Sequence, residues 1–157
     1  MLRSHKHARR VTLLVATLAF LVLTAQAAMA VSPHFISASA ARSGDNLVVQ
    51  WKEAGLGDNL NIDYSATATA TRVDSCVNGG NNVPADPKKT TTQAQVSAQG
   101  TFSVKNGSVN GSLTLTPPAT TLTCPKGQKA TLISLSYTGV SITDLTNGIT
   151  EPIPGTF

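Results

Sequence analysis

The chain has 157 residues, of which only 13% are charged and 4% are aromatic. Twelve Lys and Arg residues against eight Asp and Glu residues give a formal net charge of +4. Four of the basic residues lie within the first ten positions, so the remaining basic and acidic residues balance. A neutral balance without a basic cluster argues against nucleic acid as a partner.

The first thirty residues have the features of a secretory signal peptide. A basic start is followed by an uncharged apolar run, Val11 to Leu23, which is too short to cross a bilayer as a mature helix. Small residues follow, with Ala28-Met29-Ala30 as the expected cleavage site and Ala25-Gln26-Ala27 as the alternative. We therefore expect residues 1–30 to be removed. Residues 31–157 are then expected to form one secreted, extracellular domain with no membrane contact.

Two short segments open the expected domain. Apolar and polar residues alternate over residues 34–41, which predicts a first strand. Residues 42–46 then supply the Gly, Asp and Asn that are typical of a turn. In the second strand Leu47, Val49 and Trp51 share one face.

Residues 59–76 are the most regular stretch of the chain. Successive side chains of a strand point to opposite faces, and here one face is apolar while the other is rich in hydroxyl groups. The apolar set consists of Leu60, Ile62, Tyr64, Ala66, Ala68 and Ala70. We expect one long strand that buries this set and exposes Thr67, Thr69 and Thr71 to solvent.

The chain contains two cysteines, Cys76 and Cys124. Export permits a disulfide, and two cysteines allow one intramolecular pair. Closing a loop of about fifty residues would stabilise the fold by about 4 kcal/mol. The alternative is that the thiols are free or pair between molecules. The segment Val77–Lys89, which is rich in Gly, Asn and Pro, is expected to be a loop.

Three further strands are predicted after this loop. Alternation from Thr90 to Val104 predicts a strand, and Asn106-Gly107 predicts a tight hairpin to a strand that stops at Pro117-Pro118. Lys129–Asp144 is the second long strand; its apolar face is expected to carry Thr131, Ile133, Leu135 and Tyr137.

Glycine and proline residues indicate the structure expected for the last part of the sequence. After Gly139 the apolar parity moves to Val140 and Ile142, which predicts either a β-bulge or a strand that changes sheets. A last strand is expected over Ile149–Phe157, and its prolines favour a sheet edge. About seven strands without helical periodicity predict an all-β fold, an antiparallel two-sheet sandwich of immunoglobulin-like architecture.

The residue inventory does not favour catalysis. His34 is the only histidine after residue 30, and no carboxylate pair forms a recognisable acid–base motif. We expect no enzyme, no catalytic residues, no metal site and no cofactor. Trp51 and Tyr64 are candidate binding residues because aromatic rings stack on sugars or flat ligands; the alternative is that both lie in the core.

Four stretches carry a resemblance to a known group of proteins: HFISASAARSGDNLVVQWKEAGLGDN, CVNGG, GSLTLTPPA and the closing IPGTF. With them the chain resembles short secreted actinobacterial proteins of unknown function. It is more loosely similar to the apoprotein carriers of enediyne chromophores, which are exported sandwiches with two disulfides and an acidic chain. The resemblance implies export and a sandwich fold, and it supplies no catalytic or binding residue.

These features favour an exported, non-enzymatic β-sandwich that acts as an extracellular binding or surface-associated module. Its partner would be an unidentified extracellular molecule or cell-surface component. One alternative is a small-molecule carrier with a cleft between its sheets. Another is a secreted hydrolase inhibitor that presents Val77–Lys89 as its contact loop.

Overall fold

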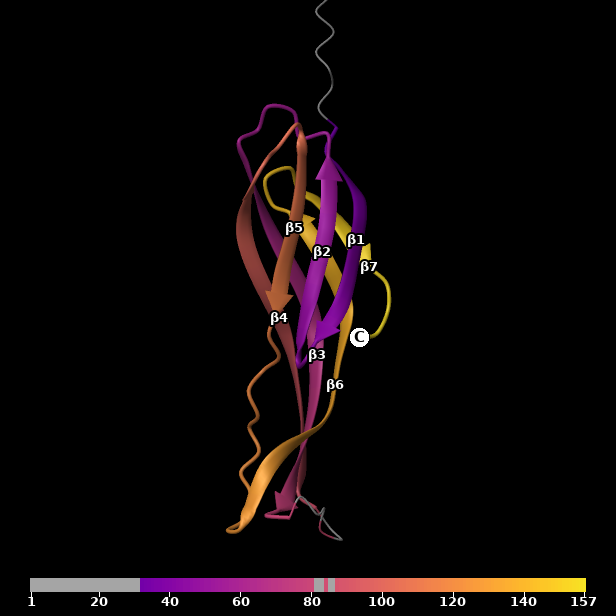
Figure 1. Cartoon of the computed structure of the whole chain (residues 1–157). Coiled ribbons are helices and arrows are strands. Elements are labelled where there is room, and N and C mark those ends of the chain that lie inside the picture. Colours follow the sequence, from indigo (N-terminus) through magenta and orange to yellow (C-terminus); the bar gives the residue numbers. More distant parts are fainter. Residues whose placement is uncertain (1–31, 81–83, 85–86) are drawn as a thin grey trace, which may run out of the picture. The chain divides into compact units, whose positions relative to one another are not determined.

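A computed structural model describes residues 32–80, 84 and 87–157, which form seven β-strands (Figure 1). The expected signal peptide, residues 1–30, lies outside the described residues. None of the described segments is a helix long and apolar enough to cross a membrane. The strands are β1 (His34–Ser43), β2 (Asn46–Ala54), β3 (Asn61–Asn78), β4 (Lys89–Ser103), β5 (Ser108–Leu115), β6 (Gln128–Asp144) and β7 (Ile149–Ile153).

The strands form two antiparallel sheets. One sheet has the order β1-β2-β5 and the other β4-β3-β6-β7. The inward side chains of both sheets meet in one apolar core, as expected for a sandwich whose strands alternate between buried and exposed positions. The predicted all-β sandwich of about seven strands is confirmed.

The long central strand β3 follows the predicted alternation closely. Its inward residues from Ile62 to Ala70 are fully buried, and Thr67, Thr69 and Thr71 on the other face are partly exposed. The prediction for Leu60 is wrong, because this side chain lies before the first residue of β3 and is 81% exposed. The alternation of apolar and polar residues does not show where along a strand the opposing sheet stops burying its inward side chains.

Strand β6 contains two irregularities in its pairing with β3. The register shifts opposite Thr67–Thr69, where Gly139 adopts a positive φ of 59°, so the predicted bulge is confirmed. A second shift opposite Val73–Asp74 leaves Ile133 as an extra residue between two paired neighbours. Ile133 is 51% exposed, so its predicted place on the apolar face is wrong.

The Asn106-Gly107 turn joins the two sheets. Both residues have positive φ, 51° and 69°, which is the geometry of a tight hairpin turn and confirms that prediction. The hairpin is closed by the Lys105–Ser108 bridge alone, because β4 continues along β3 while β5 pairs with β2.

The last strand is shorter than predicted but lies at a sheet edge as expected. Strand β7 ends at Ile153, and the chain then bends at Gly155. Phe157 forms two backbone hydrogen bonds with Tyr137, at 2.8 and 3.0 Å, so the C-terminal residues still follow β6.

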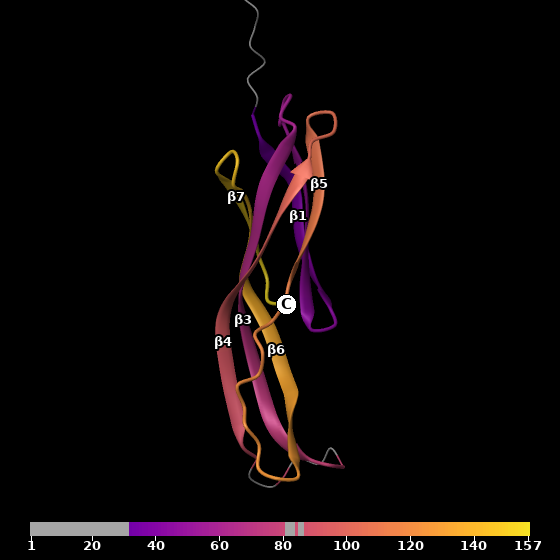
Figure 2. The same ribbon diagram turned by 90° about the vertical axis from the view of Figure 1, so that its left-hand side faces the viewer.

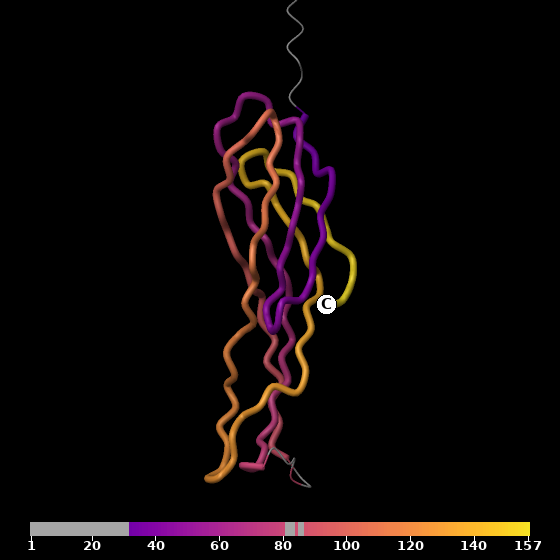
Figure 3. The backbone as a smooth tube through the Cα atoms, in the orientation of Figure 1, coloured from indigo at the N-terminus to yellow at the C-terminus, as the bar shows by residue number. Residues whose placement is uncertain are grey.

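Strands β3, β4 and β6 continue past the end of the three-stranded sheet (Figure 2). We call the part covered by β1, β2 and β5 the sandwich end. We call the other part the extension. It consists of Arg72–Asn78, the residues of β4 and β6 that pair with this segment, and residues 116–127. In the extension the irregular segment 116–127 runs beside the strands (Figure 3). Arg42, beside the turn between β1 and β2, donates to the Leu135 carbonyl at 2.8 Å where the two parts meet.

The predicted disulfide lies in the extension. Cys76 and Cys124 are bonded to each other, with their Cα atoms 5.6 Å apart, which ties segment 116–127 to β3. Strand β3 runs to Asn78, so the loop predicted for Val77–Lys89 is shorter than expected. Residues 81–83 and 85–86 of that loop lie outside the described residues.

An ion pair supports the same segment. Arg72 donates to both oxygens of the buried Asp74 carboxylate, at 2.7 and 2.9 Å, and also to the Pro118 carbonyl at 3.3 Å. The hydrogen bond from Arg72 holds the pKa of Asp74 below its usual value.

Candidate functional site

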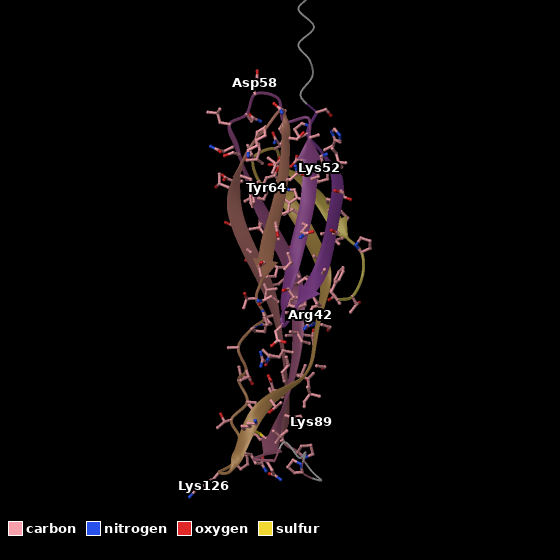
Figure 4. The ribbon with its side chains drawn as sticks, viewed as in Figure 1. Arg42, Lys52, Asp58, Tyr64, Lys89 and Lys126 are labelled. Atoms are coloured by element: carbon pink, nitrogen blue, oxygen red, sulfur yellow. A yellow bond between two sulfur atoms is a disulfide. The ribbon has the colours of Figure 1, made fainter. Side chains whose placement is uncertain are left out.

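The two candidate binding residues, Trp51 and Tyr64, lie in the core of the sandwich end (Figure 4 labels Tyr64). Their side chains are 4% and 0% exposed, and their ring centroids are 4.8 Å apart. Phe102 completes the cluster, with its centroid 5.0 Å from Trp51 and 5.7 Å from Tyr64. Alternation explains the placement, because both residues occupy inward positions of their strands.

Trp51 needs a glycine on the neighbouring strand. Its register partner on β5 is Gly111, and a Cβ atom at that position would collide with the indole ring. The glycine thus allows the largest side chain of the core to lie flat over β5.

A buried carboxyl group lies next to the aromatic cluster. Glu53 is two residues after Trp51 on the same face of β2 and is 0% exposed. The Tyr64 hydroxyl donates to Glu53 Oε2 at 2.6 Å, which links β2 to β3. Glu53 was missed as a notable residue, although the parity of Leu47, Val49 and Trp51 already places it inward.

The surroundings of Glu53 favour its neutral form. Burial raises the pKa of Glu53 to about 7; the hydrogen bond from Tyr64 opposes this shift and the charge of Asp144 adds to it. Burial, with the Glu53 carboxyl next, raises the pKa of Tyr64 well above its usual value.

Asp144, the last residue of β6, stabilises the turn that follows this strand. It is 0% exposed and accepts hydrogen bonds from the backbone N–H groups of Thr146 and Asn147, at 2.8 and 2.9 Å. Its second oxygen accepts from Asn147 Nδ2 at 2.6 Å. These bonds shape the turn between β6 and β7. Glu53 and Asp144 are thus two buried carboxyl groups, close enough for the charge of Asp144 to raise the pKa of Glu53.

A groove crosses the outer face of the three-stranded sheet. Two rows of exposed side chains run from β1 over β2 to β5, since Ser37 pairs with Lys52 and Ser39 pairs with Gln50. The hollow between the rows has a volume of about 500 Å³, and we call it the outer groove. Its lining residues are Ser37, Ser39, Gln50, Trp51, Lys52, Asn110, Gly111 and Ser112.

The outer groove offers hydrogen-bonding groups of both kinds. Serine hydroxyls and the amides of Gln50 and Asn110 donate and accept hydrogen bonds, and Lys52 adds one ammonium donor. Trp51 and Gly111, whose side-chain positions face the core, contribute to its base. No lining residue is a carboxylate, a histidine or a cysteine. The groove is therefore suited to holding a hydroxyl- or carbonyl-rich molecule, and it has no acid–base pair for chemistry.

A smaller hollow lies on the outer face of the four-stranded sheet. It has a volume of about 340 Å³ and includes Asp63, Gln99, Thr101 and Leu145. The Thr101 hydroxyl already donates to Asp63 at 2.5 Å, so fewer of its groups are available than in the outer groove.

The remaining candidate for chemistry is His34, which pairs with Ala54 on β2 and is close enough to Glu53 to oppose the rise in the pKa of that carboxyl. His34 is exposed at the start of β1, with Nδ1 2.8 Å from the Ser32 carbonyl oxygen. Among the described residues, no group of three or more His, Cys, Asp or Glu side chains is arranged to hold a metal ion. Comparison of the chain with protein-family models, curated proteins and solved structures found no match. The fold and its surfaces define a two-sheet antiparallel sandwich with one disulfide and a polar surface groove.

Proposed function

We propose that the protein is an exported, non-enzymatic binding module that acts outside the cell, and that the outer groove holds its ligand. The observation that carries this proposal is the pair of polar rows across β1, β2 and β5, which border a shallow, open hollow of about 500 Å³. The side chains project from paired strands, and such rigid elements position binding groups better than loops do.

The lining chemistry indicates the class of ligand. Hydroxyl and amide groups recognise neutral molecules rich in hydroxyl and carbonyl groups, and saccharides of the cell surface have this character. Lys52 favours a ligand that also carries an acidic group. We therefore propose an extracellular or cell-surface saccharide as the partner, with the disulfide maintained in an oxidising environment.

The test is a titration of the isotopically labelled protein with soluble neutral and uronic-acid oligosaccharides, followed by NMR. We expect shifts of the amide signals of Ser37, Gln50 and Asn110, and an affinity loss of about tenfold or more when Gln50 and Asn110 are both replaced by Ala. The matched control replaces Asn59 and Asn78, which are exposed amides outside the outer groove. Shifts spread over both sheets, or none with any saccharide, would contradict the proposal.

The two alternatives make different structural demands. A carrier with a cleft between its sheets would have to displace the Trp51, Tyr64 and Phe102 rings, whose centroids lie 4.8 to 5.7 Å apart. A hydrolase inhibitor would use the Val77–Lys89 loop, part of which lies outside the described residues. The outer groove requires no such rearrangement.

We also propose an immunoglobulin-like connectivity. In constant-type immunoglobulin domains the first, second, fifth and fourth strands form one sheet and the third, sixth and seventh form the other. The order β1-β2-β5 and β4-β3-β6-β7 follows from that pattern when the fourth strand pairs with the third. A solved structure with a different strand order would contradict this assignment.

A further inference from the structure

Strand β4 forms an unusually long free edge. It is the outermost strand of its sheet and pairs with β3 over its full length without a register shift (Figures 1 and 2). The opposite edge of the same sheet is β7, which has five residues and contains Pro152. Natural sheets usually protect their edges with prolines, bulges or charges. Between Thr90 and Ser103, β4 has none of these.

The register shows which backbone groups point outward. The Val104 N–H donates to the Leu60 carbonyl at 3.0 Å, and the Cys76 N–H donates to the Lys88 carbonyl at 2.9 Å. Both bonds continue the β3–β4 register, in which bonded and non-bonded pairs alternate. The even-numbered residues of β4 therefore bond to β3, and the odd-numbered residues from Thr91 to Thr101 direct their N–H and C=O groups outward. Within the described part of the chain, no backbone group bonds to this outer side.

The sequence of β4 reads similarly in both directions from Val96. Three of the six pairs at equal distances from Val96 are identical: Thr91 matches Thr101, Gln93 matches Gln99, and Ala94 matches Ala98. The inward-facing pairs Thr92–Gly100 and Thr90–Phe102 differ. Gln95 matches Ser97, which is also polar and uncharged. A two-fold axis through Val96 would thus place like residues opposite each other, as in isologous dimers.

We propose that the β4 edges of two copies of this chain pair antiparallel around Val96 to form a continuous eight-stranded sheet. In this register the odd-numbered residues meet each other, so the outward backbone groups of one copy bond those of the other. Gln93 of one copy faces Gln99 of the other, and amides hydrogen-bond to each other readily. No like charges face each other, because Thr90–Ser103 contains no charged residue.

The dimer leaves the outer groove free. The joined edges belong to the four-stranded sheet, whereas the groove lies on the outer face of the other sheet. Segment 116–127 contacts the side chain of Thr92, an even-numbered residue that faces inward, so this contact leaves the outward backbone groups of β4 unused. This proposal does not depend on the ligand of the groove, but a dimer with two grooves would bind multivalent surfaces more tightly.

The experiment is sedimentation equilibrium of the purified protein at rising concentration, with two double variants that differ only in the sign of the charge at residue 99. Gln93→Lys with Gln99→Lys places lysines opposite each other twice in the proposed register, and we expect a dissociation constant about tenfold higher. Gln93→Lys with Gln99→Glu places opposite charges there, and we expect affinity equal to that of the native chain or tighter.

Both positions are exposed in the monomer and lie six residues apart on one strand, so neither variant should change the fold. Circular dichroism and melting temperature check this point. A native chain that stays monomeric at every concentration would overturn the proposal. Equal weakening of the dimer by both variants would also overturn it, because only the antiparallel register distinguishes them.

Discussion

Strand β3 runs through two environments that are supported in different ways. At the sandwich end its inward residues from Ile62 to Ala70 pack against the second sheet in one apolar core. In the extension the inward positions become Arg72, Asp74 and Cys76, and an irregular segment replaces the second sheet as their cover. An ion pair and a covalent bond hold the strand there in place of large apolar side chains.

The two ends of β3 are stabilised differently because the segments that pack on them differ in apolar side chains. A second sheet brings regularly spaced apolar side chains, and burial of apolar area then stabilises both layers. Residues 116–127 contain few large apolar side chains, of which only Leu122 is buried. The long strands can therefore extend past the second sheet because the disulfide and the Arg72–Asp74 pair fasten this poorer cover.

The largest expected effect tests the sandwich end. Trp51→Ala removes the ring that packs on Tyr64, Phe102 and Gly111, and it should lower the free energy of unfolding by up to about 5 kcal/mol. Urea denaturation measures this loss. Leu60→Ala is the control, because this apolar side chain is 81% exposed and its removal should leave stability nearly unchanged.

Removal of the disulfide tests the extension. Replacing Cys76 and Cys124 together by Ala should cost about 4 kcal/mol, since 48 residues of sequence separation make the closed loop long. Urea denaturation of the native and double-variant chains gives the difference. If the double variant is as stable as the native chain, the cover of the extension does not depend on its covalent bond.

The pH dependence tests the buried carboxyl of the sandwich end. The pKa of Glu53 is raised from 4.5 to about 7 on folding, so its stabilising contribution is present below pH 4.5 and is lost as pH rises through 7. Stability should fall by up to about 3 kcal/mol over this range. Glu53→Gln removes this slope and keeps an acceptor for the Tyr64 hydroxyl. Glu151→Gln, on an exposed glutamate, should leave the slope unchanged.

The smallest effect is expected at the ion pair of the extension. Asp74→Asn keeps the shape of the side chain but weakens the two hydrogen bonds from Arg72, which should cost about 1 to 2 kcal/mol at neutral pH. The lowered pKa of Asp74 means that its contribution is present above pH 3.8 and is lost as pH falls through the folded-state pKa. Acid titration of unfolding stability, with Asp58→Asn as the exposed control, measures both effects.

The sequence predicted the parts of this comparison that depend on local pattern. Alternation placed Trp51 and Tyr64 inward, the presence of two cysteines in a chain expected to be exported predicted the Cys76–Cys124 bond, and Gly139 marked a bulge. The second bulge, at Ile133, has no glycine to indicate it.

Other features depend on pairing between distant segments, which local pattern does not contain. Asn106-Gly107 predicts a chain reversal but not that the two strands enter different sheets. The outer groove requires the register of β1, β2 and β5, and the buried Glu53–Asp144 pair requires β2 and β6 to meet.

Amide hydrogen exchange of the protein with its disulfide intact and reduced tests the two-part account most directly. If the disulfide fastens the extension, reduction should let Asp74–Asn78 and the paired residues of β6 exchange by local opening, whereas Ile62–Ala70 should lose only the protection that corresponds to the lower global free energy of unfolding. Equal loss of protection at both ends of β3 would contradict the account, because the extension would then open only together with the sandwich end.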